Sequence, residues 1–282
     1  MRAHEDRAHE DRAHEHGDPG QSGHGSARDW WEARYAERDG VWSGRVNAVL
    51  ADVVSGLPTG GGRALDLGCG EGGDVVWLAE QGWTVTGVDL SPTAVERGER
   101  AARAAGVAER TRFVAADLAT WGPGPGPGTG ERFDLVTASF LQSWPVEIPR
   151  EAILHRAAGA VAPGGHLLVT AHAAPPHADL PEEMRSYRFP TPEQDLAALR
   201  LDEGWDVLVA EARPRTTAGP DGEPHETVDS IVLVRRLPGD DASQRRQPVG
   251  VVDRAPRPVV PRDLRRCLTA RWAPSRSLAV CS

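Results

Sequence analysis

The stretch LDLGCGEGGD, residues 65–74, constrains the fold of this chain more than any other segment. It overlaps the end of a short apolar segment, RALDL (63–67), and runs into an apolar segment with helical spacing, GDVVWLAEQ (73–81). Glycines permit a tight turn and a close approach of the backbone to a ligand, which a Cβ would obstruct. A strand, a glycine-rich turn and a helix in this order predict the first unit of a parallel α/β sheet, with a ligand at the turn.

The same alternation of short apolar segments and helical patterns continues along the chain. Five strands are expected before residue 175, and two more follow without a helix between them. Alternating strands and helices predict a parallel sheet with helices on both faces, and the last two strands are expected to form an antiparallel hairpin. The seven expected strands are 63–67, 84–90, 111–118, 133–140, 166–172, 205–213 and 227–237.

Helix starts are marked by capping residues. Ser91 followed by Pro92 predicts a helix that runs to Gly106, and Thr191-Pro192-Glu193-Gln194 is a capping box with proline in the first turn. Two helices are expected before the glycine loop, at 29–38 and 44–57, and another at 149–162, followed by a Pro-Gly-Gly turn.

The composition of the two ends predicts three regions along the 282 residues: a tail at 1–27, a folded domain at 28–237 and a second tail at 238–282. The first tail contains five of the ten histidines and almost no large apolar residue, so we expect disorder, with a metal-binding arm as the alternative. The second tail has nine arginines against four aspartates and no glutamate, and disorder is again expected.

Charge and cysteine usage exclude several classes of protein. The chain has a net charge of −9 and the excess of basic residues is confined to the second tail, so no nucleic-acid partner is expected for the folded domain. No apolar stretch is long enough to span a bilayer, and the charged N-terminus does not resemble a signal peptide. The chain has three cysteines, and their spacing is not that of metal ligands, so we expect neither disulfides nor a metal site. The low cysteine content also predicts a cytoplasmic location.

Two cofactors compete for the glycine loop. Gly68, Gly70 and Gly73 satisfy the dinucleotide pattern G-x-G-x-x-G, which favours an NAD(P)-dependent oxidoreductase. Asp66, two residues before the first glycine, points the other way, because a carboxylate beside a helix N-terminus would repel a pyrophosphate. A ligand with a cationic amine and no phosphate, such as S-adenosylmethionine, would be attracted by Asp66; the alternative is that this side chain caps the loop.

Two further acids end the next two strands. Asp89 follows VTGV and suits ribose hydroxyls, a role common to both cofactors, while Asp117 follows VAA and suits an adenine amino group or a turn cap. Acidic residues at the ends of three successive strands are not required by a pyrophosphate ligand. The pattern therefore favours S-adenosylmethionine.

LDLGCGEGGD, TVTGVDLS, VAADLATW and FDLVTASF, in this order, resemble the class I S-adenosylmethionine-dependent methyltransferases over residues 28–237. The segments WWEARYAERDGVWSGRVN and PGGHLLVTAH are similar to the small-molecule branch that includes the tellurite-resistance-type bacterial methyltransferases. The resemblance implies a Rossmann-like, seven-stranded sheet, mostly parallel with a C-terminal antiparallel hairpin. It also implies methyl transfer to a small molecule, and the lack of a spanning apolar stretch predicts no membrane partner.

The resemblance implies roles for individual residues. The glycine loop, including Cys69, would approach the methionine part of the cofactor, Asp66 its amino group, Asp89 the ribose, and Asp117 with Leu118 the adenine. Trp42 and Arg45 would cover the cofactor from the N-terminal segment, although both packing and solvent exposure are alternatives. The full set of expected cofactor-binding residues is Trp42, Arg45, Asp66, Gly68, Cys69, Gly70, Gly72, Asp89, Leu90, Asp117, Leu118 and Ser139.

Methyl transfer requires a base only when the acceptor must lose a proton. His172 ends the fifth strand, where substrate is expected to enter, and is the candidate for that role; an ordinary loop histidine is the alternative. Two other functional classes remain open on the sequence: the NAD(P)-dependent oxidoreductase, and a non-catalytic protein that binds S-adenosylmethionine.

Overall fold

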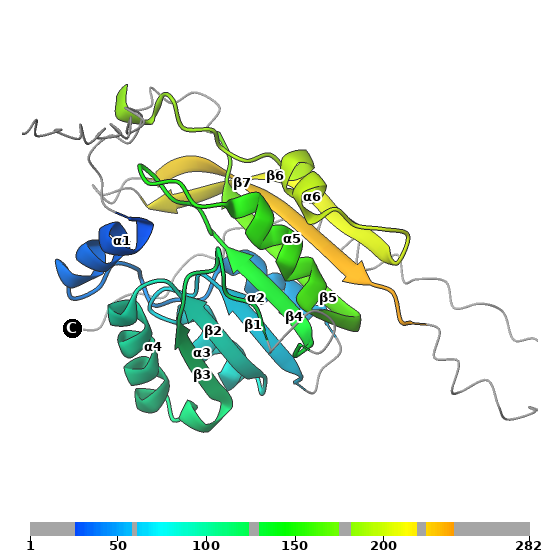
Figure 1. Ribbon diagram of the computed structural model, residues 1–282, viewed down its shortest axis with the longest axis horizontal. Helices are drawn as coiled ribbons and strands as arrows, with labels where there is room; N and C mark the ends of the chain where they lie inside the picture. The colour runs from blue at the N-terminus through cyan, green and yellow to red at the C-terminus, as the bar shows by residue number, and fades with distance from the viewer. Residues whose placement is uncertain (1–25, 58–60, 124–129, 175–181, 219–223, 240–282) are drawn as a thin grey trace, which may run out of the picture.

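The computed structural model describes residues 26–57, 61–123, 130–174, 182–218 and 224–239 (Figure 1). The expected tails at 1–27 and 238–282 lie almost entirely outside the described residues. No helix in the described ranges is both long and apolar enough to cross a membrane.

A seven-stranded mixed sheet forms the centre of the molecule (Figure 1). Its strand order is β3-β2-β1-β4-β5-β7-β6, and neighbouring strands among the first five are parallel, whereas β7 is antiparallel to both β5 and β6. This confirms the predicted mostly parallel sheet with a C-terminal antiparallel hairpin. The strands are β1 (Arg63–Leu67), β2 (Thr84–Asp89), β3 (Thr111–Ala115), β4 (Phe133–Ser139), β5 (Val161–His172), β6 (Trp205–Ala218) and β7 (Pro224–Arg236).

Helices cover both faces of the sheet, as predicted. Helices α5 and α6 pack with one apolar cluster that includes Leu154 and Leu199, and α2 and α3 pack with a second cluster on the opposite face that includes Leu50 and Leu78. The described helices are α1 (Ala27–Ala36), α2 (Ala48–Ser55), α3 (Gly73–Glu80), α4 (Pro92–Ala104), α5 (Arg150–Ala160), α6 (Pro192–Leu199) and the short 3₁₀ turns η1 (Ala108–Arg110) and η2 (Glu182–Met184).

The predicted caps are present at two helices. The Ser91 hydroxyl accepts from the backbone N–H of Ala94 at 3.1 Å, and Thr191 with Gln194 forms the reciprocal capping box. Each cap satisfies backbone donors that the first helical turn leaves free. The starts of α4 and α6 are therefore determined by local sequence.

Several predicted boundaries were wrong; β3 ends at Ala115 instead of residue 118, so Asp117 follows the strand, and β6 continues to Ala218 instead of residue 213. The second helix begins at Ala48 instead of residue 44, because the Asn47 side chain caps it by accepting from Val49 N–H at 2.8 Å. The Pro-Gly-Gly segment, expected as a turn before the fifth strand, lies within β5, which pairs with β4 from Val161 onward and shifts register between Phe133 and Leu135. A bulge with Gly164 at a φ of +83° accommodates the extra residues.

Candidate functional site

The carboxyl ends of the parallel strands meet along one edge of the sheet, above a cavity of about 1920 Å³. The strand order places residues from five different strands side by side at this edge, because β1 and β4 are neighbours where the order of the chain reverses. The cavity is lined by every residue that the sequence predicts for the site except Gly72, namely Trp42, Arg45, Asp66, Gly68, Cys69, Gly70, Asp89, Leu90, Asp117, Leu118, Ser139 and the candidate base His172.

At two positions of the glycine loop, the backbone conformation and the neighbouring atoms leave no room for a side chain. Gly70 has a φ of +52°, and a Cβ there would lie 3.1 Å from both the Tyr35 hydroxyl and Trp42 Nε1. Gly72, with a φ of +83°, faces away from the cavity, and a Cβ there would meet the Phe113 ring at 2.8 Å. Gly70 therefore allows Tyr35 and Trp42 to approach the loop closely, whereas Gly72 allows the loop to pack against β3.

Asp66 lies on the floor of the cavity and is only 2% exposed. The Thr137 hydroxyl donates to Asp66 Oδ1 at 2.8 Å. Burial raises the pKa of Asp66 to about 8, and the negative charges of Asp74 and Asp89 contribute in the same direction. A cation bound beside Asp66 would restore its charge, so this carboxyl group suits a ligand with an ammonium or sulfonium group.

Asp89 and Asp74 complete a cluster of three acids around the loop. Asp89 accepts from the backbone N–H groups of Gly70 at 2.8 Å and Ser91 at 2.9 Å, so it fixes the glycine loop as well as facing the cavity. Asp74, in the first turn of α3, accepts from Asn47 N–H at 2.7 Å. Burial raises the pKa of both carboxyl groups. Such a cluster favours a cationic ligand and opposes a pyrophosphate.

The two residues that the sequence predicts beside the adenine, Asp117 and Leu118, differ in burial. Leu118 is 7% exposed and packs in the apolar cluster with α5 and α6, while Asp117 is exposed and accepts from Ala119 N–H at 2.8 Å. The turn-cap alternative for Asp117 is therefore present in the structure, and Asp117 also lines the cavity.

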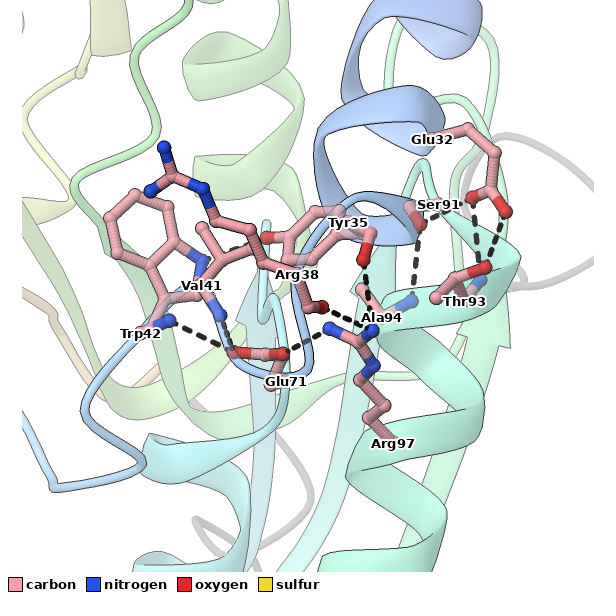
Figure 2. Close-up of polar contacts among 10 residues, drawn as sticks. All are labelled: Glu32, Tyr35, Arg38, Val41, Trp42, Glu71, Ser91, Thr93, Ala94 and Arg97. Carbon is pink, nitrogen blue, oxygen red and sulfur yellow. Dashed lines mark hydrogen bonds and ion pairs between the residues drawn. The ribbon is translucent and has the colours of Figure 1, made fainter.

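The segment after α1 crosses the glycine loop and is held there by Glu71 (Figure 2). Glu71 Oε2 accepts from the backbone N–H groups of Val41 at 3.0 Å and Trp42 at 2.9 Å. Its other oxygen pairs with Arg97 of α4 at 2.8 Å, and Arg97 also donates to the carbonyls of Tyr35 and Arg38. This set of bonds, the Glu71–Arg97 clamp, joins the N-terminal segment, the glycine loop and α4.

The same segment brings Trp42 and Arg45 to the mouth of the cavity. Trp42 is 54% exposed, and its Nε1 donates to the Tyr35 hydroxyl at 2.8 Å (Figure 2). Arg45 is exposed and forms no ion pair with a described residue, which leaves its guanidinium free for an anionic group.

His172 lies at the end of β5 with its side chain 50% exposed, stacked on the Phe140 ring at a centroid distance of 4.3 Å. Its Nδ1 lies 3.7 Å from the carboxylate of Asp229, which pairs with His172 in the β5–β7 register. Arg215 of β6 donates to both Asp229 oxygens, at 2.7 and 3.2 Å. Burial tends to raise the pKa of Asp229, but hydrogen bonding and charge from His172 and Arg215 lower it below its ordinary value. A carboxylate that is charged at neutral pH thus lies beside the imidazole.

Several residues of the site were missed by sequence reasoning. Glu71 and Asp74 lie inside the quoted glycine loop, where their acidic character was visible, but their partners come from distant segments. Asp229 and Arg215 belong to the hairpin, which the sequence predicted without a role in the site. Only the register of β5 against β7 brings this pair to His172.

Comparisons with known proteins agree with this geometry. A family described as "Methyltransferase domain" matches residues 64–165. Trans-aconitate 2-methyltransferase of Streptomyces coelicolor is 31% identical over 225 residues, which cover 77% of this chain and 68% of the relative. Probable thiol methyltransferase 2 of Arabidopsis thaliana is 36% identical over 107 residues, which cover 38% of this chain and 45% of the relative.

Among solved structures, the N-methyltransferase NodS from Bradyrhizobium japonicum WM9, in complex with S-adenosyl-L-homocysteine, superposes with a TM-score of 0.53. It is 17% identical, and the alignment covers 75% of this chain and 99% of NodS, so it supports the fold alone. The chain spans about half the length of the first two curated relatives that it matches, with 45% and 52% coverage.

Proposed function

Because this chain belongs to the S-adenosylmethionine-dependent methyltransferases, we propose that it transfers the methyl group of S-adenosylmethionine to a small-molecule acceptor. The observation that carries the proposal is the cluster of three acids in one large cavity, of which Asp66 and Asp89 are buried and Asp74 is half-buried. When bound, S-adenosylmethionine supplies a methyl group already activated on a sulfonium. The cluster suits its positive charges and would oppose the pyrophosphate of NAD(P).

The cofactor-binding roles follow the arrangement of the cavity. Asp66 is proposed to pair with the amino group and Asp89 to accept from the ribose hydroxyls, while Asp117 and Leu118 flank the adenine. Gly68 and Gly70, with Cys69 between them, let the backbone approach the methionine part. Ser139 supports the same location, because it lines the cavity and its hydroxyl is buried.

At the edge of the cavity, the Arg45 guanidinium is proposed to pair with the cofactor carboxylate. Trp42 covers the opening of the cavity beside it. Gly72 would act only indirectly, by allowing the loop to pack against Phe113.

His172 is proposed as the base that removes the acceptor proton. Its Nδ1 faces Asp229, so Nε2 is the ring nitrogen left for the acceptor. The chain's other contribution is to hold the acceptor in line with the methyl group and to exclude water, which lowers the entropic part of the barrier.

Relatives support a small molecule as the acceptor, since those named above are a trans-aconitate and a probable thiol methyltransferase. The acidic character of the chain, with a net charge of −9, argues against a nucleic-acid acceptor. A cytoplasmic location belongs to the same proposal and rests on the low cysteine content.

Calorimetric titration of the full chain with S-adenosylmethionine, S-adenosylhomocysteine and NAD tests the proposal. We expect micromolar binding of the first two, no binding of NAD, and at least a roughly tenfold loss of affinity in Asp89→Ala. Asp89→Asn removes the charge and keeps an acceptor for only one of the two backbone N–H groups, of Gly70 or of Ser91. Asp206→Ala, an exposed acid on β6 outside the cavity, is the matched control and should bind as the unmodified chain does. Binding of NAD alone would overturn the proposal.

A further inference from the structure

A smaller cavity of about 290 Å³ adjoins the cofactor cavity. The two cavities share Trp31, Gln142 and His172 as lining residues, so the proposed base faces both of them. The smaller cavity is formed by α1, the loop after β4, the end of β5 and the segment that contains η2 and leads to α6. A molecule held there would lie next to the point where the methyl group is proposed to arrive.

Aromatic rings form two of its walls. Trp30 and Trp31 of α1 pack edge to face with ring centroids 4.8 Å apart. Tyr187 and Phe189 form a second edge-to-face pair, also at 4.8 Å, on the segment before α6. Gln142 connects this second wall to His172. Its Nε2 donates to the Tyr187 hydroxyl at 3.0 Å, and its Oε1 accepts from the backbone N–H of His172 at 2.6 Å. Walls of this kind favour flat, apolar ring systems.

Arg34 contributes a positive charge to this aromatic cavity. Its guanidinium carbon lies 5.6 Å from the centroid of the Trp30 ring and 6.0 Å from that of Trp31. Its Nε is buried without a hydrogen-bond partner, and no described carboxylate forms an ion pair with it. An unsatisfied buried donor is costly, and a carboxylate matches the planar fork of a guanidinium.

We propose that this cavity binds the methyl acceptor and selects a planar aromatic anion, whose rings lie between the two aromatic pairs and whose acidic group pairs with Arg34. The inference rests on the proposed function, because it assigns a substrate class to the same site. A nucleophilic atom of such a ligand would lie beside His172, which both cavities share.

The test uses 2-naphthoate as a probe, titrated calorimetrically into the full chain saturated with S-adenosylhomocysteine. Two matched probes separate the features of the site: 2-naphthamide lacks the charge, and cyclohexanecarboxylate lacks the aromatic rings. We expect 2-naphthoate to bind roughly tenfold more tightly than either, since a charge-assisted hydrogen bond and ring packing each contribute about that factor.

Substitutions in α1 test whether Arg34 binds the acidic group of the probe. Arg34→Met should weaken 2-naphthoate roughly tenfold and leave 2-naphthamide unchanged, while Arg34→Lys should restore part of the affinity. Arg28→Met, an exposed arginine on the same helix, is the control and should bind as the unmodified chain does. Equal affinity of Arg34→Met and the unmodified chain for 2-naphthoate, with unchanged circular dichroism, would overturn the inference.

Titration with S-adenosylhomocysteine alone distinguishes this inference from the proposed function. Arg34 does not line the cofactor cavity, so Arg34→Met should keep its affinity for S-adenosylhomocysteine. Binding of S-adenosylhomocysteine without binding of 2-naphthoate overturns the acceptor site alone. Arg34-dependent binding of 2-naphthoate without any binding of S-adenosylhomocysteine overturns the proposed function and leaves the aromatic anion site standing.

Discussion

His172 shows how much a single side chain depends on its neighbours for a chemical role. The imidazole ring of His172 is stacked on the ring of Phe140, whose φ of +52° is uncommon for a residue other than glycine. The imidazole also faces the buried carboxylate of Asp229 on β7. Arg215 keeps that carboxylate charged, and its guanidinium lies 5.8 Å from the Phe140 ring. These contacts orient the imidazole, which would otherwise rotate freely at the end of a strand.

We therefore expect His172→Asn to lower the rate of methyl transfer by about 10²-fold or more when the acceptor must lose a proton. The measurement is formation of S-adenosylhomocysteine with a panel of phenols, carboxylic acids and thiols. Asp229→Asn should have a smaller effect, because it alters the orientation of the base but not its presence. A rate for His172→Asn equal to that of the unmodified chain, across acceptors that ionise only at high pH, would exclude this residue as the base.

Among the elements, the N-terminal segment and the glycine loop are held together by a partly buried ion pair. The side chains of Glu71 and Arg97 are 11% and 17% exposed, and the clamp joins α4 to the loop and to the chain that follows α1 (Figure 2). Glu32 adds a second connection from α1, because it accepts from the hydroxyls of Ser91 and Thr93 at the start of α4. The cover of the cofactor cavity thus depends on α4.

Breaking the clamp should loosen the cover without unfolding the sheet. Arg97→Met removes the donors to Glu71 and to the Tyr35 and Arg38 carbonyls, and we expect a loss of about 1–3 kcal/mol in the stability of the closed segment. Hydrogen exchange of the amides of Val41 and Trp42 should then accelerate, and S-adenosylhomocysteine should bind more weakly. The control is Glu99→Gln, which breaks an exposed ion pair with Arg103 on the same helix. Unchanged exchange in Arg97→Met would show that the segment is held by packing alone.

At the scale of the whole molecule, the buried acids couple the stability of the fold to pH. The pKa of Asp66 is raised from its unfolded value near 4 to about 8, so the folded state holds a proton that the unfolded state releases. The free energy of unfolding therefore falls as the pH rises from about 4 to about 8. A cation bound beside Asp66 would stabilise its charged form and lower its pKa. Binding of the cofactor is therefore expected to release the proton of Asp66 in the same pH range.

Asp66→Asn should remove this part of the pH dependence while keeping an acceptor for the Thr137 hydroxyl. In the absence of cofactor, we expect the stability of the variant, relative to that of the unmodified chain, to increase by about 2–3 kcal/mol as the pH rises from 5 to 7. Urea unfolding at several pH values measures the difference, and Asp206→Asn on the exposed edge of the sheet is the control. An identical pH dependence in Asp66→Asn and the unmodified chain would contradict the raised pKa.

The features of this protein that local sequence determines are those whose causes lie within one element or one turn. Alternating strand and helix patterns predict a parallel sheet, the glycines of 68–72 require a backbone conformation that other residues avoid, and Ser91 and Thr191 satisfy donors of the helices that they begin. Asp66, Asp89 and Asp117 line one cavity because parallel strands end at the same edge of the sheet.

Contacts between distant segments were decided only by the tertiary structure. Glu71 meets Arg97 because α3 and α4 pack side by side, Asp74 meets Asn47 because the chain before α2 returns to the start of α3, and Asp229 meets His172 through the antiparallel register of β7. None of these partners is within ten residues of the other, so no local pattern encodes the pairing. The glycine loop specified the kind of site, whereas the packing of whole elements determined which charges face the ligand.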